Sequence, residues 1–189
     1  MEKPVVIMLS GWSGSGKDAA ASLLVEEMRF IRLAFADMLK RAVSQESDVP
    51  LYYFHDRLLK DTPLPDSGLT PRDLLLAHAI KARVTDPDIY SRILVKNIQA
   101  GGRYVISDWR YKREYEFIER ELGPCLPRTE GAGQTATLVR VRILRPGVAP
   151  SDDHTEHDLD DDTFDVVLDN SGCISDLRDA LKVIVRRIL

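Results

Sequence analysis

Apolar and polar positions divide the chain into short apolar runs that alternate with longer amphipathic stretches. The apolar runs have the length of strands, and turn-forming or charged residues flank them. Continuous apolar runs of this length are typical of strands buried on both faces of a parallel sheet. The pattern predicts five strands, at residues 5–10, 31–36, 103–108, 136–144 and 164–170.

The stretches between these runs have helical spacing and helix-terminus signals. Thr70 followed by Pro71 predicts a helix start, because threonine caps helices and proline suits the first helical position. Asp37 is a second N-cap candidate, and Gly101 with Gly102 predicts a helix end. The pattern predicts helices at residues 17–28, 37–45, 51–60, 70–83, 86–100, 111–122 and 174–188.

Strands that alternate with helices indicate an α/β fold with a doubly wound parallel sheet. A chain of 189 residues fits one domain, so we expect residues 1–189 to form a single domain. If the protein binds two substrates, we expect the helical region at about 37–100 to enclose the second of them. The segment at about 145–162 is polar and strongly acidic, and we expect it to be mobile and lid-like.

Composition and charge narrow the class of protein without indicating its chemistry. The chain is 44% hydrophobic and 30% charged, which is ordinary for a globular enzyme. A net charge of -4 argues against a broadly basic surface that coats nucleic acid. Cys125 and Cys173 lack the spacing of metal ligands, and no apolar run is long enough to cross a membrane. We therefore expect a cytoplasmic protein with reduced thiols.

The segment GWSGSGKD, residues 11–18, is the clearest chemical motif. It stands between the first predicted strand and the first predicted helix, and it fits the pattern Gly-x4-Gly-Lys. The glycines allow backbone N–H groups to face a polyphosphate at the helix N-terminus, and Lys17 would contact the β- and γ-phosphates. The residues predicted to bind ATP are Gly11, Ser13, Gly14, Ser15, Gly16, Lys17 and Asp18.

Asp18 stands where such a loop normally has serine or threonine, whose hydroxyl holds Mg²⁺. A carboxylate beside a polyphosphate would repel it unless a cation lies between them, and Mg²⁺ would supply that cation. The alternative is that Asp18 occupies the first helical turn, where the helix dipole favours an acid. Both explanations can hold, and Asp18 is the one predicted metal ligand.

Charged residues also follow two other predicted strands. Asp108 ends the strand at 103–108 and Arg110 follows it, while Arg145 follows the strand at 136–144. In doubly wound sheets the carboxyl ends of strands line the ligand crevice, where an acid can hold metal or accept a proton and an arginine can grip phosphate. The alternative is a helix cap and a surface arginine. The predicted catalytic residues are Lys17, Asp108, Arg110 and Arg145.

Other catalytic motifs are missing from the sequence. There is no Ser-His-Asp nucleophile arrangement and no NKxD motif of a GTPase, and the acidic, histidine-containing run at 152–158 matches no zinc pattern. Phosphoryl transfer depends on positioning and charge neutralisation more than on a protein nucleophile. The motifs that are present suit that chemistry.

The strand followed by GxxxSGKD, together with FADMLKRAV, VISDWRYKRE and RPGVAPSDDHTE, resembles the deoxynucleoside monophosphate kinases of tailed phages. The resemblance is strongest at the N-terminal loop and from Arg103 onward, and it is weaker in the middle. Animal-type phosphomevalonate kinases look like a sister group that shares SGKD and the strand-end Asp-x-Arg. The resemblance implies a P-loop NTPase fold of the nucleoside-monophosphate-kinase type, acting in phage DNA metabolism in the host cytoplasm.

The resemblance also implies roles for individual residues. Gly14, Gly16, Lys17 and Asp18 match the loop that holds ATP and Mg²⁺, and Arg145 with residues 152–156 matches the lid side. The residues that match acceptor-binding positions are Lys40, Arg72, Asp108, Arg110 and Glu114.

Two departures from the phage pattern concern the acceptor. Ser13 and Gly14 stand where the phage kinases tend to have basic residues, and Ser91 replaces an expected aromatic residue, although Tyr90 is adjacent. Both departures fall on the acceptor or phosphate side of the predicted site. They leave the identity of the acceptor open.

The predicted activity is transfer of the γ-phosphoryl group of ATP, with Mg²⁺, to a free deoxynucleoside monophosphate. One alternative acceptor is 5-hydroxymethyluracil in DNA, phosphorylated during thymidine hypermodification. Phosphomevalonate is a third acceptor, which Glu114 and the RPG…TE segment disfavour. A non-catalytic nucleotide-binding module is an alternative of another class, against which the pair Asp108 and Arg110 argues. The sequence does not decide whether the chain forms a homodimer.

Overall fold

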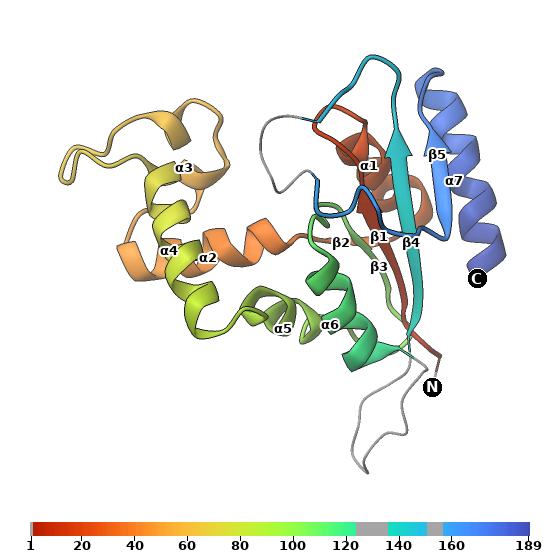
Figure 1. The fold of residues 1–189 in the computed structure, drawn as a ribbon, viewed down its shortest axis with the longest axis horizontal. Coiled ribbons are helices and arrows are strands. Elements are labelled where there is room, and N and C mark those ends of the chain that lie inside the picture. Colours follow the sequence, from red (N-terminus) through yellow and green to blue (C-terminus); the bar gives the residue numbers. More distant parts are fainter. Residues whose placement is uncertain (1, 124–135, 151–156) are drawn as a thin grey trace, which may run out of the picture. The chain divides into compact units, whose positions relative to one another are not determined.

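A five-stranded sheet organises the protein (Figure 1). The computed structural model describes residues 2–123, 136–150 and 157–189. The strands lie in the order β2-β3-β1-β4-β5, and every neighbouring pair is parallel. They are β1 (Val5–Ser10), β2 (Ile31–Leu33), β3 (Arg103–Ile106), β4 (Thr137–Leu144) and β5 (Val166–Asp169). The predicted α/β fold with a parallel sheet is confirmed.

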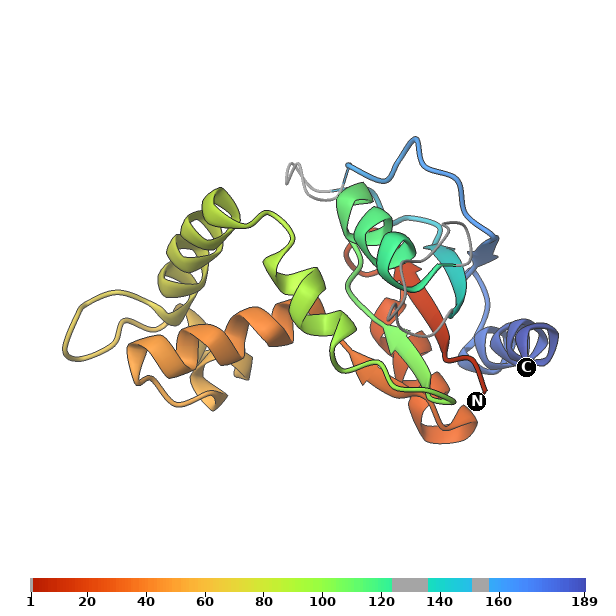
Figure 2. The ribbon, with the colours of Figure 1, turned by 90° about the horizontal axis from the view of Figure 1, so that it is seen from below.

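Helices cover both faces of this sheet. Figure 2 shows α6 (Lys112–Leu122) on the opposite face from α1 (Lys17–Met28) and α7 (Ile174–Ile188). Alternate residues of the central strand β1 enter the core beneath α1 and α7, where Leu24 and Leu181 are also completely buried. Because helices cover both faces, all six residues of β1 are buried, which explains its continuous apolar sequence.

The chain divides into two compact units. The sheet unit contains Met1–Ala34 and Val95–Leu189, and the helical unit contains Phe35–Leu94. The helical unit consists of α2 (Phe35–Ser47), α3 (Tyr52–His55), the short 3-10 helix η1 (Leu59–Asp61), α4 (Pro71–Thr85) and most of α5 (Ile89–Val95). Within this unit, α2 packs against α4.

The predicted start of α4 is confirmed in detail. The Thr70 hydroxyl accepts a hydrogen bond from the Asp73 backbone N–H, and the Asp73 carboxylate accepts from the Thr70 backbone N–H. Pro71 occupies the first helical position, where its missing N–H costs no hydrogen bond. This reciprocal cap fixes where α4 begins.

Several predicted boundaries were wrong. The strands predicted at 103–108 and 164–170 extend beyond β3 and β5, so Asp108 lies outside its strand. Three other differences have a local reason. Helix α2 begins at Phe35, which is buried, so the second strand ends at Leu33 and Asp37 lies in the first helical turn. The predicted helix at 51–60 is divided because the Asp56 carboxylate accepts the backbone N–H groups of residues 58 and 59. Helix α5 ends at Val95, and the chain then turns so that the Gly101 N–H donates to the Glu2 carbonyl.

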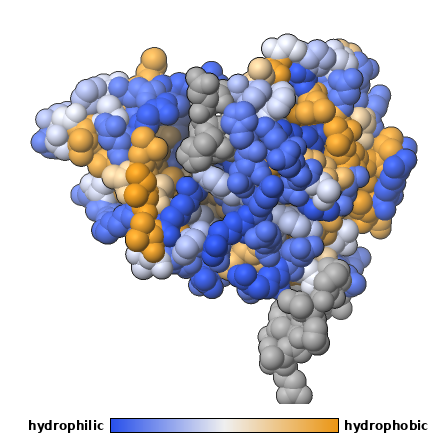
Figure 3. Space-filling model, viewed as in Figure 1, coloured by the Kyte–Doolittle hydropathy of each residue, from blue (hydrophilic) through white to orange (hydrophobic). Residues whose placement is uncertain are grey.

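Strand β5 is an edge strand, and an apolar groove runs between it and α7. The groove has a volume of about 490 Å³, and Figure 3 shows apolar surface over β5 and α7. The residues that line it include Leu138, Val166, Leu168, Val183, Ile184 and Ile188. The groove begins at the amino-terminal half of β4. Nucleotide sites of such sheets lie at the carboxyl ends of strands, so the groove is not at the position expected for a nucleotide site.

Two findings concern other expectations from the sequence. Among the described residues, no helix has both the length and the apolar character needed to cross a membrane. Cys173 is a free, exposed thiol. Cys125 and the acidic run at 152–156 lie outside the described residues.

Candidate active site

The loop between β1 and α1 has the backbone shape that a phosphate-binding loop requires. Gly11, Gly14 and Gly16 have φ values of 143°, 81° and 107°. A Cβ atom on Gly11 would lie 2.4 Å from the backbone oxygen of Ile143, and one on Gly16 would lie 2.3 Å from Nδ2 of Asn170. Glycine is therefore required at position 11 by conformation and by space, and at position 16 by conformation, since the Asn170 side chain could move aside.

Lys17 lies at the first position of α1 and folds back over this loop. Its Nζ donates hydrogen bonds to the backbone oxygens of Gly11 and Trp12, the second over 2.8 Å. The Trp12 oxygen also accepts the Ser15 N–H, at 3.1 Å. The ammonium group of Lys17 is thus held against the backbone carbonyls of its own loop.

Asp18 lies in the first turn of α1, one residue after Lys17, and it is exposed. This position agrees with the helix-dipole explanation, since an acid is stabilised near a helix N-terminus. No group of three or more His, Cys, Asp or Glu side chains that could hold a metal ion occurs in the part of the chain that the structure describes. The metal-binding role of Asp18 stays a prediction.

Asp108 and Arg110 follow the end of β3 at the edge of the sheet that carries the loop. Met8, near the end of β1, pairs with Ile106, the last residue of β3. Asp108 follows Ile106 by two residues, so it comes just after the carboxyl end of β3, beside the end of β1. Arg110 is exposed, and Glu114 accepts hydrogen bonds from the backbone N–H groups of Arg110 and Tyr111 at 3.0 and 3.2 Å. Glu114 therefore has a structural part as the cap of α6, in addition to the acceptor role predicted for it.

The remaining predicted residues lie in three other places. Arg145 follows β4 in the sheet unit and is exposed. In the helical unit, Lys40 lies 3.7 Å from Asp37, and the Arg72 guanidinium binds the Asp61 carboxylate through two nitrogens. The sheet unit thus contains the loop, Asp108, Arg110 and Arg145, and the helical unit contains Lys40 and Arg72.

Asn170 is a residue at the loop that the sequence reasoning missed. Its Nδ2 donates to the Ser15 carbonyl at 2.8 Å, and its own backbone N–H donates to the Leu144 carbonyl. It follows β5, so the rule that strand ends line the site could have found it. Asn170 fixes the turn of the loop just before Gly16.

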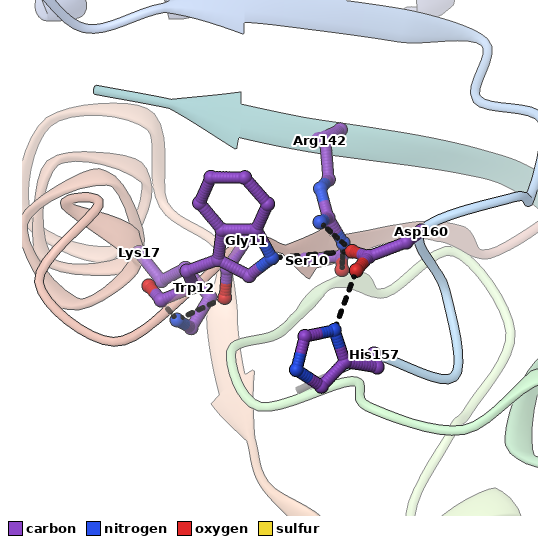
Figure 4. Close-up of polar contacts among 7 residues, drawn as sticks. All are labelled: Ser10, Gly11, Trp12, Lys17, Arg142, His157 and Asp160. Carbon is purple, nitrogen blue, oxygen red and sulfur yellow. Dashed lines mark hydrogen bonds and ion pairs between the residues drawn. The ribbon is translucent and has the colours of Figure 1, made fainter. Parts of the chain in front are cut away.

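A second group that the sequence reasoning missed surrounds the Arg142 side chain on β4 (Figure 4). The Arg142 side chain is 8% exposed, and its guanidinium donates to Ser10 Oγ at 3.1 Å and to Asp160 Oδ1 at 2.6 Å. Asp160 also accepts from Trp12 Nε1 at 3.1 Å, and its other oxygen lies 3.0 Å from His157 Nδ1. These contacts join the loop, β4 and the turn at 157–161.

Asp160 is expected to make the stability of the protein depend on pH. Partial burial alone would raise its pKa, but hydrogen bonds from His157, Trp12 and Arg142 hold the pKa of this carboxyl below its usual value. A carboxyl whose pKa is lower in the folded state contributes stability above its unfolded pKa, and this contribution is lost as the pH falls through the folded pKa.

We therefore expect the free energy of unfolding of the wild type to decrease on acidification below about pH 4, and more steeply than that of Asp160→Asn. Urea unfolding between about pH 3 and 6 measures both slopes. Equal slopes in the two proteins would show that Asp160 does not titrate in this way.

The comparisons with known proteins agree with this architecture. No established family profile matches the chain. The chain is 32% identical over 194 residues to a protein of Acanthamoeba polyphaga mimivirus that is provisionally named a deoxynucleotide monophosphate kinase, and the match covers 91% of each chain.

Among solved structures, TT1252 from Thermus thermophilus aligns over 100% of both chains at 16% identity with a TM-score of 0.52. A protein of Chloroflexus aurantiacus, provisionally described as a kinase, aligns over 100% of both chains at 12% identity with a TM-score of 0.50. At such low identities the two structures support the fold alone.

The parallel sheet and the glycine-rich loop with Lys17 define a P-loop protein, and the viral relative makes it a kinase, an enzyme that transfers phosphoryl groups. The chain belongs to the family of the mimivirus protein.

Proposed function

We propose that this kinase transfers the γ-phosphoryl group of ATP to a deoxynucleoside monophosphate, giving ADP and a deoxynucleoside diphosphate. The observation that carries the proposal is the match to the mimivirus protein, whose name specifies deoxynucleotide monophosphates and which is covered over 91% of its length. The loop geometry supports ATP as the donor, because backbone N–H groups and Lys17 at a helix N-terminus suit a polyphosphate.

In this proposal an oxygen of the acceptor monophosphate attacks the γ-phosphorus, and ADP leaves. Lys17 neutralises charge on the oxygens of the transferring group, and Arg145 approaches the same phosphates from the end of β4. Asp108 and Arg110, at the end of β3, orient the acceptor. Lys40, Arg72 and Glu114 are the further acceptor-binding residues that we propose.

The residues present fit Mg²⁺ as the accompanying ion. Mg²⁺ is held in kinases by one or two carboxylates together with substrate phosphates, so it needs no cluster of protein ligands in the free enzyme. Asp18, beside Lys17, and Asp108 supply such carboxylates. When bound, the ion would neutralise charge on the β- and γ-phosphates.

A panel of acceptors tests the proposal. ADP release would be measured with ATP, Mg²⁺ and each of the four deoxynucleoside monophosphates, with 5-hydroxymethyluracil-containing DNA, and with mevalonate phosphate. We expect ADP release with at least one free deoxynucleoside monophosphate and a shallow dependence of activity on salt, because few phosphates are contacted.

Two outcomes would contradict the proposal in different ways. Activity with the modified DNA alone, falling steeply as salt increases, would move the acceptor to DNA. Binding of ATP without ADP release with any acceptor would leave a nucleotide-binding module.

A further inference from the structure

The backbone carbonyl of Trp12 is a central acceptor in the phosphate-binding loop. It accepts hydrogen bonds from Lys17 Nζ at 2.8 Å and from the Ser15 N–H at 3.1 Å. The orientation of this one peptide group therefore sets where the ammonium group lies and how the loop turns. Contacts that hold Trp12 in place therefore also constrain the position of the Lys17 ammonium group.

The side chain of Trp12 is held by groups outside the loop. Its Nε1 donates to Asp160 Oδ1 at 3.1 Å, and the Arg142 guanidinium carbon lies 5.5 Å from the centre of the indole ring (Figure 4). A cation placed over an indole face at this distance is attracted to the ring. The indole is thus fixed by one directional hydrogen bond and by one ring contact.

Arg142 gives this arrangement a rigid base. It lies on β4 directly opposite Ser10, the last residue of β1, and donates to the Ser10 hydroxyl. The guanidinium also lies 5.5 Å from the ring centre of Phe164. A buried guanidinium needs an anionic partner, and Asp160 supplies it at 2.6 Å. The position of Arg142 therefore depends on Asp160.

Asp160 joins three segments that are far apart in the sequence. It accepts from the loop through Trp12 and from β4 through Arg142, and it contacts His157 within its own turn. The turn itself is closed by a hydrogen bond from the Asp160 N–H to the His157 carbonyl at 3.0 Å. The carboxylate is not part of the loop, yet it holds the loop residue that carries the Lys17 contact.

We propose that Asp160 is a positioning residue of the phosphate-binding loop, which acts through Trp12 and Arg142 to keep the loop in the shape that receives a polyphosphate. This inference rests on the proposed function in one respect, that the loop binds the phosphates of ATP. Three glycines at positive φ make the loop costly to order, so fixing Trp12 in the free protein lowers the ordering cost of binding.

The first test compares Asp160→Asn with Asp161→Asn. Both variants lose one negative charge in the same turn and both residues are exposed, but the contacts to Trp12, Arg142 and His157 are made by Asp160. Calorimetric titration with ATP and Mg²⁺ needs no acceptor. We expect the dissociation constant to rise about tenfold in Asp160→Asn, as for loss of a charge-assisted hydrogen bond, and to change less than about twofold in Asp161→Asn.

The second test asks whether the effect passes through the indole. Trp12→Phe keeps a ring against Arg142 but lacks the N–H donor, so it should weaken ATP binding in the same direction. In the double variant with Asp160→Asn the two effects should not add, because the substitution at Asp160 weakens the same contact that Trp12→Phe removes. This variant also keeps the inference testable if Asp160→Asn does not fold.

A spectroscopic measurement reports the loop directly. The sequence has two tryptophans, so biosynthetic 5-fluorotryptophan gives two ¹⁹F resonances, and Trp12→Phe assigns them. In Asp160→Asn we expect the Trp12 resonance to shift, while the resonance of Trp109, which is 1% exposed and donates to the Tyr111 carbonyl, stays in place.

The outcomes separate this inference from the proposed function. A wild type that does not bind ATP would overturn both. A wild type that binds ATP, with Asp160→Asn and Trp12→Phe binding it equally well or more tightly, would overturn the positioning role and leave the proposed function standing. Additive effects in the double variant would show that Asp160 does not act through Trp12, and would also overturn the inference.

Discussion

Replacement of Lys17 by alanine is expected to lower kcat/KM for ATP by about a thousandfold while the protein stays folded. In the proposed function the ammonium group is the cation that the loop brings to the phosphates, and no other lysine occurs between residues 4 and 39. In the free protein its contacts include two hydrogen bonds to loop carbonyls in a partly buried position, and we expect its loss to change the melting temperature little. Steady-state ADP release measures the effect.

Lys182→Ala is the matched control for this variant. It removes the same group from the surface of α7, where the Lys182 ammonium lies 3.7 Å from Asp179. Its activity should equal that of the wild type, because exposed ion pairs contribute little. If Lys17→Ala kept turnover within about tenfold of the wild type, Lys17 would not be catalytic in the sense proposed.

The variant Gly11→Ala is expected to lower the free energy of unfolding by about 3 kcal/mol, and to abolish ATP binding in the protein that remains folded. Two costs combine at this position. The φ of 143° is one that side chains rarely adopt, and the new Cβ would lie 2.4 Å from the backbone oxygen of Ile143 on β4. Because a backbone atom cannot move aside cheaply, the end of β1 must separate from β4.

Gly147→Ala separates these two costs. Gly147 also has a positive φ, 77°, in the same unit, but nothing lies within 4 Å of its would-be Cβ. We expect it to cost about 1 kcal/mol, from backbone strain alone, and to leave ATP binding intact. Urea unfolding and calorimetric titration measure both variants, and equal costs in the two would show that the contact with β4 is not what requires glycine at position 11.

Much of the sheet could be predicted because its central strands, β1 and β3, are largely buried and read as continuous apolar runs. The order of the strands could not, since it depends on pairings such as that of Val5 with both Arg103 and Thr137. The division of the predicted helix at 51–60 was also missed. There the Asp56 side chain competes for backbone N–H groups, and helical spacing of apolar residues carries no information about that competition.

The candidate site divides in the same way between local and distant determinants. Residues 11–18 could be identified from spacing alone, because the motif is contiguous in the sequence. The structure then places its three glycines at positive φ. The contacts of Asn170 and Asp160 with the loop come from distant segments, so spacing could not reveal them. For Asn170 the signal was its place after a strand, and for Asp160 it was Arg142, which lies in a largely apolar strand where a buried guanidinium requires an acid. The sequence at 158–162 contains several acidic residues.

The division into units has a consequence for the order in which the protein can fold as the ribosome makes it. The helical unit is one continuous segment, so its contacts can form as soon as that segment has emerged. Strand β1 emerges first, yet both of its neighbours, β3 and β4, are synthesised much later. The nascent chain therefore carries an unpaired, largely apolar strand until β3 has been synthesised, and this strand is the part of the protein that a chaperone would be expected to protect.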